Sequence, residues 1–275
     1  TIMPKGLGNG YGSVGTPAPP PAAPAAAPAA AAAEAAAPSG VTFPADFPNS
    51  VRHFLIIACV AYAIAAAVAL FSNFSRAKFG AAQSLIFLTG AAGAIGYFAM
   101  MTGLGVDYKT IDATPRVVFP GRYLTQLVTQ PLLLSTIAFL SKLDLASTVP
   151  LVVEDVLLIM AGYLGSTTVA PMKYFWWLSS VFFTVLISVQ LLAATKGGHA
   201  VLRNAVYAVI VCLAAFQLLW VFGSEGSANL GLSPEVGLYV IVDVAMKVAV
   251  GLYLIGNMAA LEKDGEQEID SQQYV

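Results

Sequence analysis

The sequence has little charge. Only 10% of its 275 residues are Asp, Glu, Lys or Arg, whereas a soluble domain carries about 25%, so most of the surface does not face water. The formal net charge is −2 and the charges are scattered, which argues against a nucleic-acid partner. The two cysteines lie inside apolar runs and cannot form a disulfide framework. Without a Gly-rich phosphate loop or a metal-spaced His/Cys cluster, neither an enzyme nor a metal site is expected.

The first forty residues differ in composition from the rest of the chain. Residues 16–40 are almost entirely Ala and Pro, and recurring prolines prevent a continuous helix. We therefore expect an extended, solvated tail over residues 1–48 and a short acidic tail over 263–275. The tail has no basic start followed by a short apolar core, so we expect no cleavable signal peptide.

Between these tails the chain is dominated by long apolar segments. A bilayer core about 30 Å thick needs roughly 20 mostly apolar residues as helix, and strands of a membrane barrel would be about half as long and would alternate. Seven segments meet the helical test. They are approximately 51–72, 81–103, 119–140, 148–166, 173–194, 201–223 and 234–260.

These segments predict an all-α fold, a seven-transmembrane-helix bundle over residues 49–262. The protein is then an integral, multi-pass membrane protein whose main partner is the lipid bilayer. Basic residues are slightly more frequent in the first, third and fifth connections and the C-terminal tail than in the other connections and the N-terminal tail, which favours an N-terminus outside the cell. A homo-oligomer remains possible.

Lys247 lies in the middle of the seventh segment, too deep to reach the membrane surface. An ionisable residue there marks a candidate functional site. Asp243 lies four residues earlier, on the same helical face, so the two can pair. One interpretation is a structural ion pair that ties helices together. The sharper one is that a desolvated, neutral lysine amine condenses with an aldehyde, with Asp243 as counterion.

The third segment carries a polar stripe. Arg122, Thr125, Thr129 and Thr136 follow at offsets that place them on one helical face. A single membrane threonine usually donates back to its own helix, but three of them beneath an arginine indicate a polar track facing the interior. In the fourth segment, we expect Asp155 to be protonated and hydrogen-bonded, because an unpaired carboxylate in apolar surroundings is costly.

Several motifs occur in an order that resembles the microbial (type 1) rhodopsins, over roughly residues 50–262. The stretch Asp243-Val244-Ala245-Met246-Lys247 is similar to that family's retinal-lysine motif. The other matching motifs are Arg122-Tyr123 with Thr129 and Pro131-Leu132-Leu133-Leu134, Gly223-Ser224-Glu225-Gly226 with Glu235, Tyr97 with Met100 and Gly103, Asp155 with Gly162 and Gly165, and Trp177 with Ser180.

The resemblance implies roles for these residues. Retinal would be bound as a Schiff base on Lys247, with Asp243 as counterion and Tyr97 nearby. Arg122 would order water and charge on the extracellular side and would also face Asp243. Glu225 and Glu235 would form the extracellular acidic pair of proton-releasing members. The ring end of the pocket would be lined by Trp177, Trp220, Gly162 and Ser180. From the residues alone, the tryptophans fit either a chromophore slot or interfacial packing.

Two departures from the family bear on transport. Outward proton pumps have an aspartate where this chain has Thr125 and a carboxylate donor where it has Thr136, so we predict no efficient outward proton pump. Threonine at the acceptor position is similar to the halorhodopsins, in which a bound chloride replaces the lost charge. The resemblance therefore implies that Thr125 and Thr129 hold chloride or another small anion.

Other departures make the pocket less aromatic. Gln126 and Leu213 stand where the family has tryptophans, Phe216 replaces a tyrosine that would bond Asp243, and Gln217 replaces a proline. The resulting hypothesis is a light-activated retinal protein that moves an anion such as chloride, as a pump or a channel. The alternative is a photosensory rhodopsin with a slow photocycle and no transport.

Overall fold

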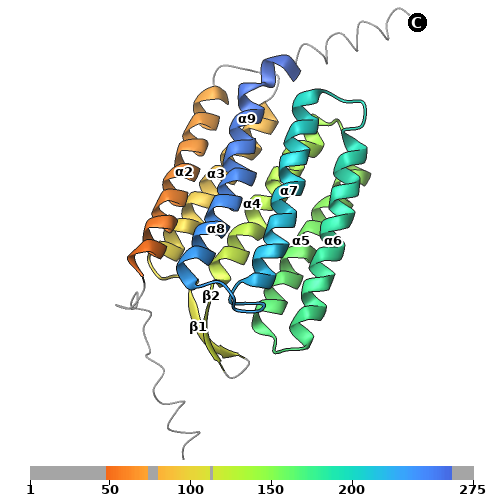
Figure 1. Ribbon diagram of the computed structural model, residues 1–275. Helices are drawn as coiled ribbons and strands as arrows, with labels where there is room; N and C mark the ends of the chain where they lie inside the picture. The colour runs from red at the N-terminus through yellow and green to blue at the C-terminus, as the bar shows by residue number, and fades with distance from the viewer. Residues whose placement is uncertain (1–47, 74–79, 112–113, 262–275) are drawn as a thin grey trace, which may run out of the picture. The chain divides into compact units, whose positions relative to one another are not determined.

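The computed structural model describes residues 48–73, 80–111 and 114–261, and the two predicted tails lie outside this range apart from residue 48. The seven predicted spans are all helical and lie side by side in one bundle (Figure 1), so the seven-helix prediction is confirmed. The helices are α2 (Asn49–Asn73), α3 (Gly80–Met101), α4 (Pro120–Leu140), α5 (Leu145–Thr167), α6 (Met172–Ala194), α7 (Ala200–Phe222), and a last span made of α8 (Leu232–Val244), η1 (Ala245–Ala249) and α9 (Val250–Gly256).

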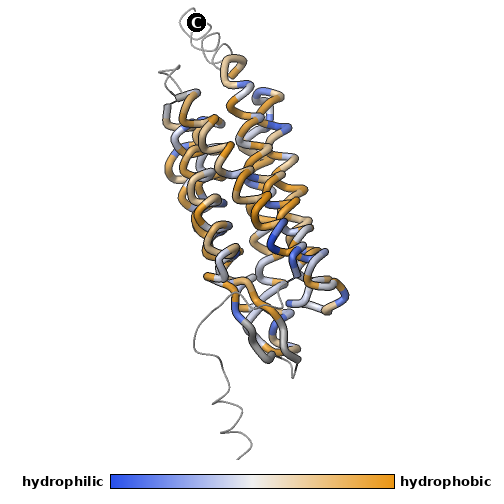
Figure 2. The backbone as a smooth tube through the Cα atoms, turned by 90° about the vertical axis from the view of Figure 1, so that its left-hand side faces the viewer, coloured by the Kyte–Doolittle hydropathy of each residue, from blue (hydrophilic) through white to orange (hydrophobic). Residues whose placement is uncertain are grey.

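The outer surface of the bundle is apolar. All seven spans are long and apolar enough to cross a membrane, and hydrophobic colours run along their length in Figure 2. Large hydrophobic side chains point outward, such as Ile95 and Val211, which are 70% and 67% exposed. Water would not tolerate so large an apolar surface, whereas lipid does. The protein is therefore an integral multi-pass membrane protein.

A β-hairpin adds to the helices. Strands β1 (Asp107–Ile111) and β2 (Thr114–Val118) pair antiparallel, with Asp107 opposite Val118, between α3 and α4. The hairpin is a short addition to the predicted all-α bundle and lies in a connection between two spans. Counting spans assigns it to a connection, because twelve residues are too few to cross a bilayer as helix.

The last span is not uniformly α-helical. Residues Ala245–Ala249 form one π-helical turn, η1, and Lys247 lies at its centre. A π turn takes up one more residue per turn than an α turn and often occurs at functional sites. The pattern of apolar residues cannot reveal this π turn. The residues of the turn other than Lys247 are all hydrophobic, so their pattern is the same for an α turn and a π turn.

Small residues let α3 pack closely against its neighbours. A side chain at Gly90 would meet the backbone of Ala66 on α2. A side chain at Gly93 would collide with the ring of Tyr62, and one at Gly96 with Thr125. These glycines thus bring α2 and α4 close to α3.

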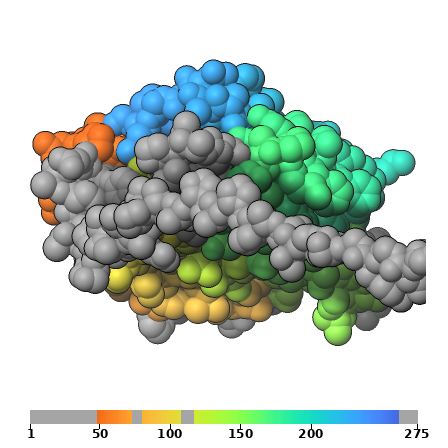
Figure 3. Space-filling model, turned by 90° about the horizontal axis from the view of Figure 1, so that it is seen from below, coloured from red at the N-terminus to blue at the C-terminus, as the bar shows by residue number. Residues whose placement is uncertain are grey.

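Seen from the end of the bundle near the hairpin, the start of α8 (blue) lies between α2 (orange) and α6 (green) (Figure 3).

Candidate functional site around Lys247

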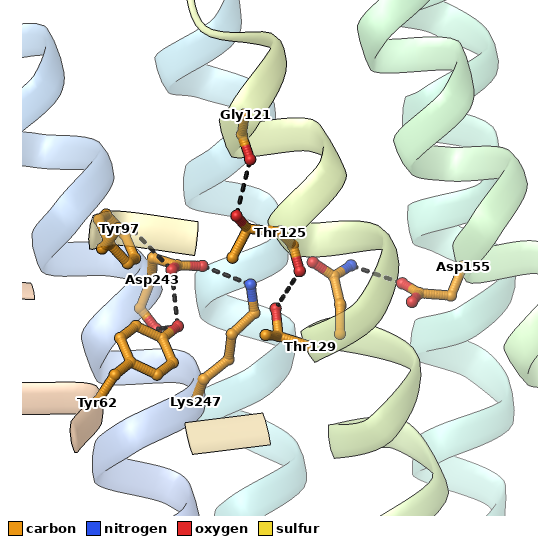
Figure 4. Close-up of polar contacts among 9 residues, drawn as sticks. Tyr62, Tyr97, Gly121, Thr125, Thr129, Asp155, Asp243 and Lys247 are labelled. Atoms are coloured by element: carbon orange, nitrogen blue, oxygen red, sulfur yellow. Dashed lines mark hydrogen bonds and ion pairs between the residues drawn. The ribbon is translucent and has the colours of Figure 1, made fainter. Parts of the chain in front are cut away.

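Lys247 and Asp243 form a buried ion pair. The Lys247 Nζ lies 2.5 Å from Asp243 Oδ1, and both residues are almost completely buried. Figure 4 shows the amine directed at the carboxylate from the same helix. The four-residue spacing predicted this contact, and the π turn at Lys247 is compatible with it. A lysine amine in this position is desolvated and held beside one negative charge.

Two tyrosines complete the surroundings of Asp243. The hydroxyls of Tyr62 on α2 and Tyr97 on α3 both donate to Asp243 Oδ2, at 2.7 and 2.8 Å, and their rings stack 5.5 Å apart. The sequence argument missed Tyr62. The available signal was a lone tyrosine in an alanine-rich span, with Gly93 leaving room for its ring. Phe216 lacks the hydroxyl expected from the resemblance, and Tyr62 supplies one from another helix.

Arg122 pairs with Glu225 rather than with Asp243. Its guanidinium lies 2.8 Å from Glu225 Oε1, and Tyr123 donates to Glu225 Oε2 at 2.9 Å. The same guanidinium lies over the ring of Tyr239, 3.7 Å from the centroid, a cation–π contact. No direct contact between Arg122 and Asp243 is found among the described residues, and the expectation that the two face each other stays a prediction. The loop after α7 brings in a carboxylate closer to the arginine.

Glu225 and Glu235 are both buried but are held separately. Glu235, in the first turn of α8, accepts hydrogen bonds from the backbone N–H of Ser224 at 2.7 Å and from its hydroxyl at 3.1 Å. A side chain at Gly223 would come within 3.0 Å of the Glu235 carboxyl carbon, so glycine permits this close approach. The acidic pair thus has one member neutralised by Arg122 and one held by hydrogen bonds.

The threonines of α4 face the interior but do not form a donor track. Thr125 donates to the carbonyl of Gly121 at 2.7 Å, Thr129 to that of Thr125 at 2.8 Å, and Thr136 to that of Leu132 at 2.8 Å. A hydroxyl has only one proton to donate. Each is therefore used within its own helix, as is usual for membrane threonines. The expected anion-holding hydroxyls receive no support from this geometry.

Asp155 on α5 is completely buried and is hydrogen-bonded to α4. Its Oδ1 accepts from Gln130 Nε2 at 2.5 Å, and its Oδ2 has no partner among the described residues. The expected hydrogen bond is thus present, while its protonation stays a prediction. Gln130 was not predicted to be the partner of Asp155, although it lies on α4 directly after Thr129.

A cavity of about 40 Å³ lies between α4, α5, α6, α7 and α8. Five residues expected around retinal line it, namely Gln126, Gly162, Ser180, Phe216 and Trp220. Three others lie elsewhere. Trp177 donates its indole N–H to the carbonyl of Gln217 at 3.1 Å, Tyr97 bonds Asp243, and Leu213 belongs to the hydrophobic core.

These residues fit a retinal. The aldehyde of retinal needs a desolvated amine with a nearby counterion, which Lys247 and Asp243 provide. Its hydrocarbon part needs an interior slot, and Leu158, Phe216 and Trp220 give apolar walls to a cavity that Arg122, Tyr123 and Tyr239 also line. A side chain added at Gly162 would contact only the Tyr123 ring, at 3.3 Å, so this wall is open on the cavity side.

A buried lysine paired with a carboxylate inside seven membrane-spanning helices defines the class of the retinal-binding membrane proteins. The comparison of sequences agrees, because the family described as bacteriorhodopsin-like protein matches residues 49–261. The chain belongs to this microbial rhodopsin family, and retinal is its cofactor. Members of this family are typically light-driven ion pumps or sensors.

Similar proteins are known among archaeal sequences and solved structures. The chain is 33% identical to Archaerhodopsin-2 of Halobacterium sp. (strain aus-2) over 193 residues, which cover 66% of this chain and 73% of that protein. It is 30% identical to Archaerhodopsin-1 of Halorubrum ezzemoulense over 187 residues, covering 65% and 72%. A light-driven proton pump from Leptosphaeria maculans has the same fold, with a TM-score of 0.71 at 21% identity, over 78% of this chain and 97% of that one.

Proposed function

We propose that the protein is a light-activated photosensor in which Lys247 holds retinal as a Schiff base and Asp243 is the only carboxylate counterion. The observation that carries this proposal is the closed set of contacts around Asp243, which accepts from Lys247, Tyr62 and Tyr97. Retinal supplies light absorption and a change of shape. The protein positions the lysine, balances its charge and excludes water.

The absence of proton-relay carboxylates on α4 supports this function over outward proton pumping. Thr125 and Thr136 stand where an acceptor and a donor would be needed, and neither hydroxyl can take up and hold a proton at neutral pH. Without a carboxylate donor, reprotonation is slow. A long-lived light-activated state suits signalling to a partner and limits the turnover of a pump.

The sequence alone had suggested anion transport. The balance of charges in the bundle interior instead favours sensing. A buried anion needs nearby positive charge or free donors. Lys247 is neutralised by Asp243 and Arg122 by Glu225, while Thr125 and Thr129 donate to their own helix. Among the described residues next to the lysine, both positive charges are therefore already balanced. The hydroxyls of Thr125 and Thr129 are not free to donate to an anion.

Light-evoked currents test the proposal. The full chain, produced with all-trans retinal, is placed in a voltage-clamped bilayer, in chloride and then in gluconate, with Lys247→Ala as the blank. We expect a visible band, a slow photocycle and no sustained current. A sustained current that follows the chloride gradient would establish anion transport instead. A sustained current independent of chloride but accompanied by a pH change would establish proton transport.

The orientation of the chain belongs to the same proposal. The slight excess of basic residues on one side supports an extracellular N-terminus. Protease digestion of sealed cells, followed by detection of a terminal tag, measures which end is accessible. Access to a C-terminal tag from outside would reverse the assignment.

A further inference from the structure

Gln217 joins α7 to α6 through its side chain. Its Nε2 donates to Ser180 Oγ and to Thr184 Oγ1, both at 2.9 Å. Thr184 itself donates to the carbonyl of Ser180 at 3.0 Å, so its oxygen can only accept from the glutamine. This fixes which way the amide points. Both amide hydrogens are used, and the Gln217 Oε1 is left over.

Four polar groups remain without a protein partner at this place. Among the described residues, the Trp220 indole N–H is completely buried without a partner. No hydrogen bond is made by the Ser180 proton, the Gln217 Oε1 or the Gln126 amide, although these three residues are not completely buried. Each of these residues is at least nine-tenths buried, and all four line the same cavity. Buried polar groups are rarely left unpaired in native proteins. These groups therefore need a polar partner inside the cavity.

A purely structural role does not account for all four groups. The tie between α6 and α7 needs only the Gln217 Nε2, and leucine or methionine would pack at Gln126 without leaving an amide unpaired. The rest of the lining combines apolar side chains, such as Leu158 and Phe216, with Arg122, Tyr123 and Tyr239, and the guanidinium of Arg122 is already paired with Glu225. An interior cavity in which a few donors and acceptors converge beside apolar side chains is the usual pattern of a small-molecule site that recognises a polar substituent.

We propose that this cavity selects a retinal whose ring carries oxygen, as in a hydroxyretinal, an inference that rests on the proposed function. A ring hydroxyl accepts from the Ser180 hydroxyl or the Trp220 N–H and donates to Gln217 Oε1. Ser180 and Trp220 are also among the residues expected at the ring end of the pocket. An unsubstituted ring would leave all these groups unpaired.

Competitive incorporation tests the inference without relying on photoactivity. The full chain is produced in cells supplied with equal amounts of all-trans retinal and all-trans 3- or 4-hydroxyretinal. The bound retinoid is then extracted from the purified pigment and measured by chromatography. We expect the hydroxylated form to be enriched about tenfold, the discrimination that one neutral hydrogen bond provides. Gln217→Leu and Ser180→Ala should each reduce that preference. The control is Gln190→Leu, which changes a glutamine of α6 that donates to Glu154 on α5, and it should keep the preference.

Equal incorporation by the unaltered protein would overturn the inference and would mean that water satisfies these groups. A preference that persists in both Gln217→Leu and Ser180→Ala would also overturn the assignment to this cavity. Neither result touches the proposed function, because a visible band would still form with retinal. Failure to form a band with any of the retinoids would instead contradict the proposed function itself.

Discussion

Two polar regions of the bundle interior differ in how their groups are satisfied. On the last span, Lys247 and Asp243 are charged and draw Tyr62 from α2 and Tyr97 from α3. On α4, the threonines are uncharged and donate to their own helix. The polar groups of the first region are therefore satisfied by side chains from other helices. Those of the second region are satisfied within α4 itself. Light-driven charge movement is consequently expected on the last span and not along α4.

Removal of the lysine should break the first region most completely. Lys247→Ala abolishes the visible band, because no other amine lies beside Asp243 among the described residues. The matched control is Lys196→Ala, which changes an exposed lysine between α6 and α7 and should keep the full band.

A fold control is needed for that variant. Removing one partner of a buried ion pair leaves an uncompensated charge and costs about 3–5 kcal/mol. The double variant Lys247→Ala with Asp243→Asn should recover most of this loss in unfolding measurements. A visible band in Lys247→Ala, with or without Asp243→Asn, would contradict attachment at Lys247.

Adding a carboxylate to α4 should give the second region an ionisable group, as the first region has in Asp243. Thr125→Asp provides a proton acceptor where the native chain has none, and a positioned acid or base typically changes rates by about 10²–10⁴-fold. We expect faster loss of the Schiff-base proton after a flash, measured by transient absorption. Thr125→Asn has a similar shape without the charge and should behave like the native protein. Equal kinetics in both variants would show that α4 is not placed to accept the proton.

Removing the hydroxyl of Tyr62 should weaken the first region moderately. Tyr62→Phe loses a buried hydrogen bond to a charged group, a loss of about 1.5–3 kcal/mol in unfolding free energy. Gly93→Ala should act in the same direction, because the added methyl group displaces the Tyr62 ring. Tyr207→Phe, on the lipid-facing side of α7, is the control. If Tyr62→Phe and Tyr207→Phe are equally stable, Tyr62 has no part in holding Asp243.

The smallest effect is expected away from the bundle interior, at the start of α5. Asp144 caps this helix by accepting from Ser147 N at 3.0 Å, and hydrogen bonding from Ser147 lowers the pKa of Asp144 below its usual value. As pH falls, the unfolded chain takes up the proton first. The cap's contribution is thus complete above about pH 3.9 and is lost as pH falls through the lower folded value.

Melting temperatures of the native protein and of Asp144→Asn, followed from pH 6 to pH 3, check this sign. The small difference between the two proteins should shrink at the acid end. A difference that grows with acid would contradict the capping role.

The features that the sequence predicted are those set by local spacing or by length. Apolar length alone defined the spans, and the four-residue offset placed Asp243 beside Lys247. The hairpin, the π turn and Tyr62 could not be found in this way. Tyr62 meets Asp243 across 181 positions of sequence, and only helix packing at Gly93 shows that its hydroxyl reaches the carboxylate.

The threonines show the opposite limit. Their spacing correctly placed Thr125, Thr129 and Thr136 on the buried side of α4. Spacing says nothing of where a hydroxyl proton points, and a carbonyl one turn earlier is always in reach. The partner of Arg122 was likewise settled by the loop after α7, which brings Glu225 to it.

The central claim is that Asp243 alone balances the charge on Lys247, and a chloride titration of the visible spectrum tests it most directly. The full chain is reconstituted with all-trans retinal, and its absorption maximum is followed as gluconate is replaced by chloride. The account predicts a visible band whose position does not change with chloride. A chloride-dependent shift that disappears in Thr125→Ala would contradict it, because an anion would then lie beside the Schiff base.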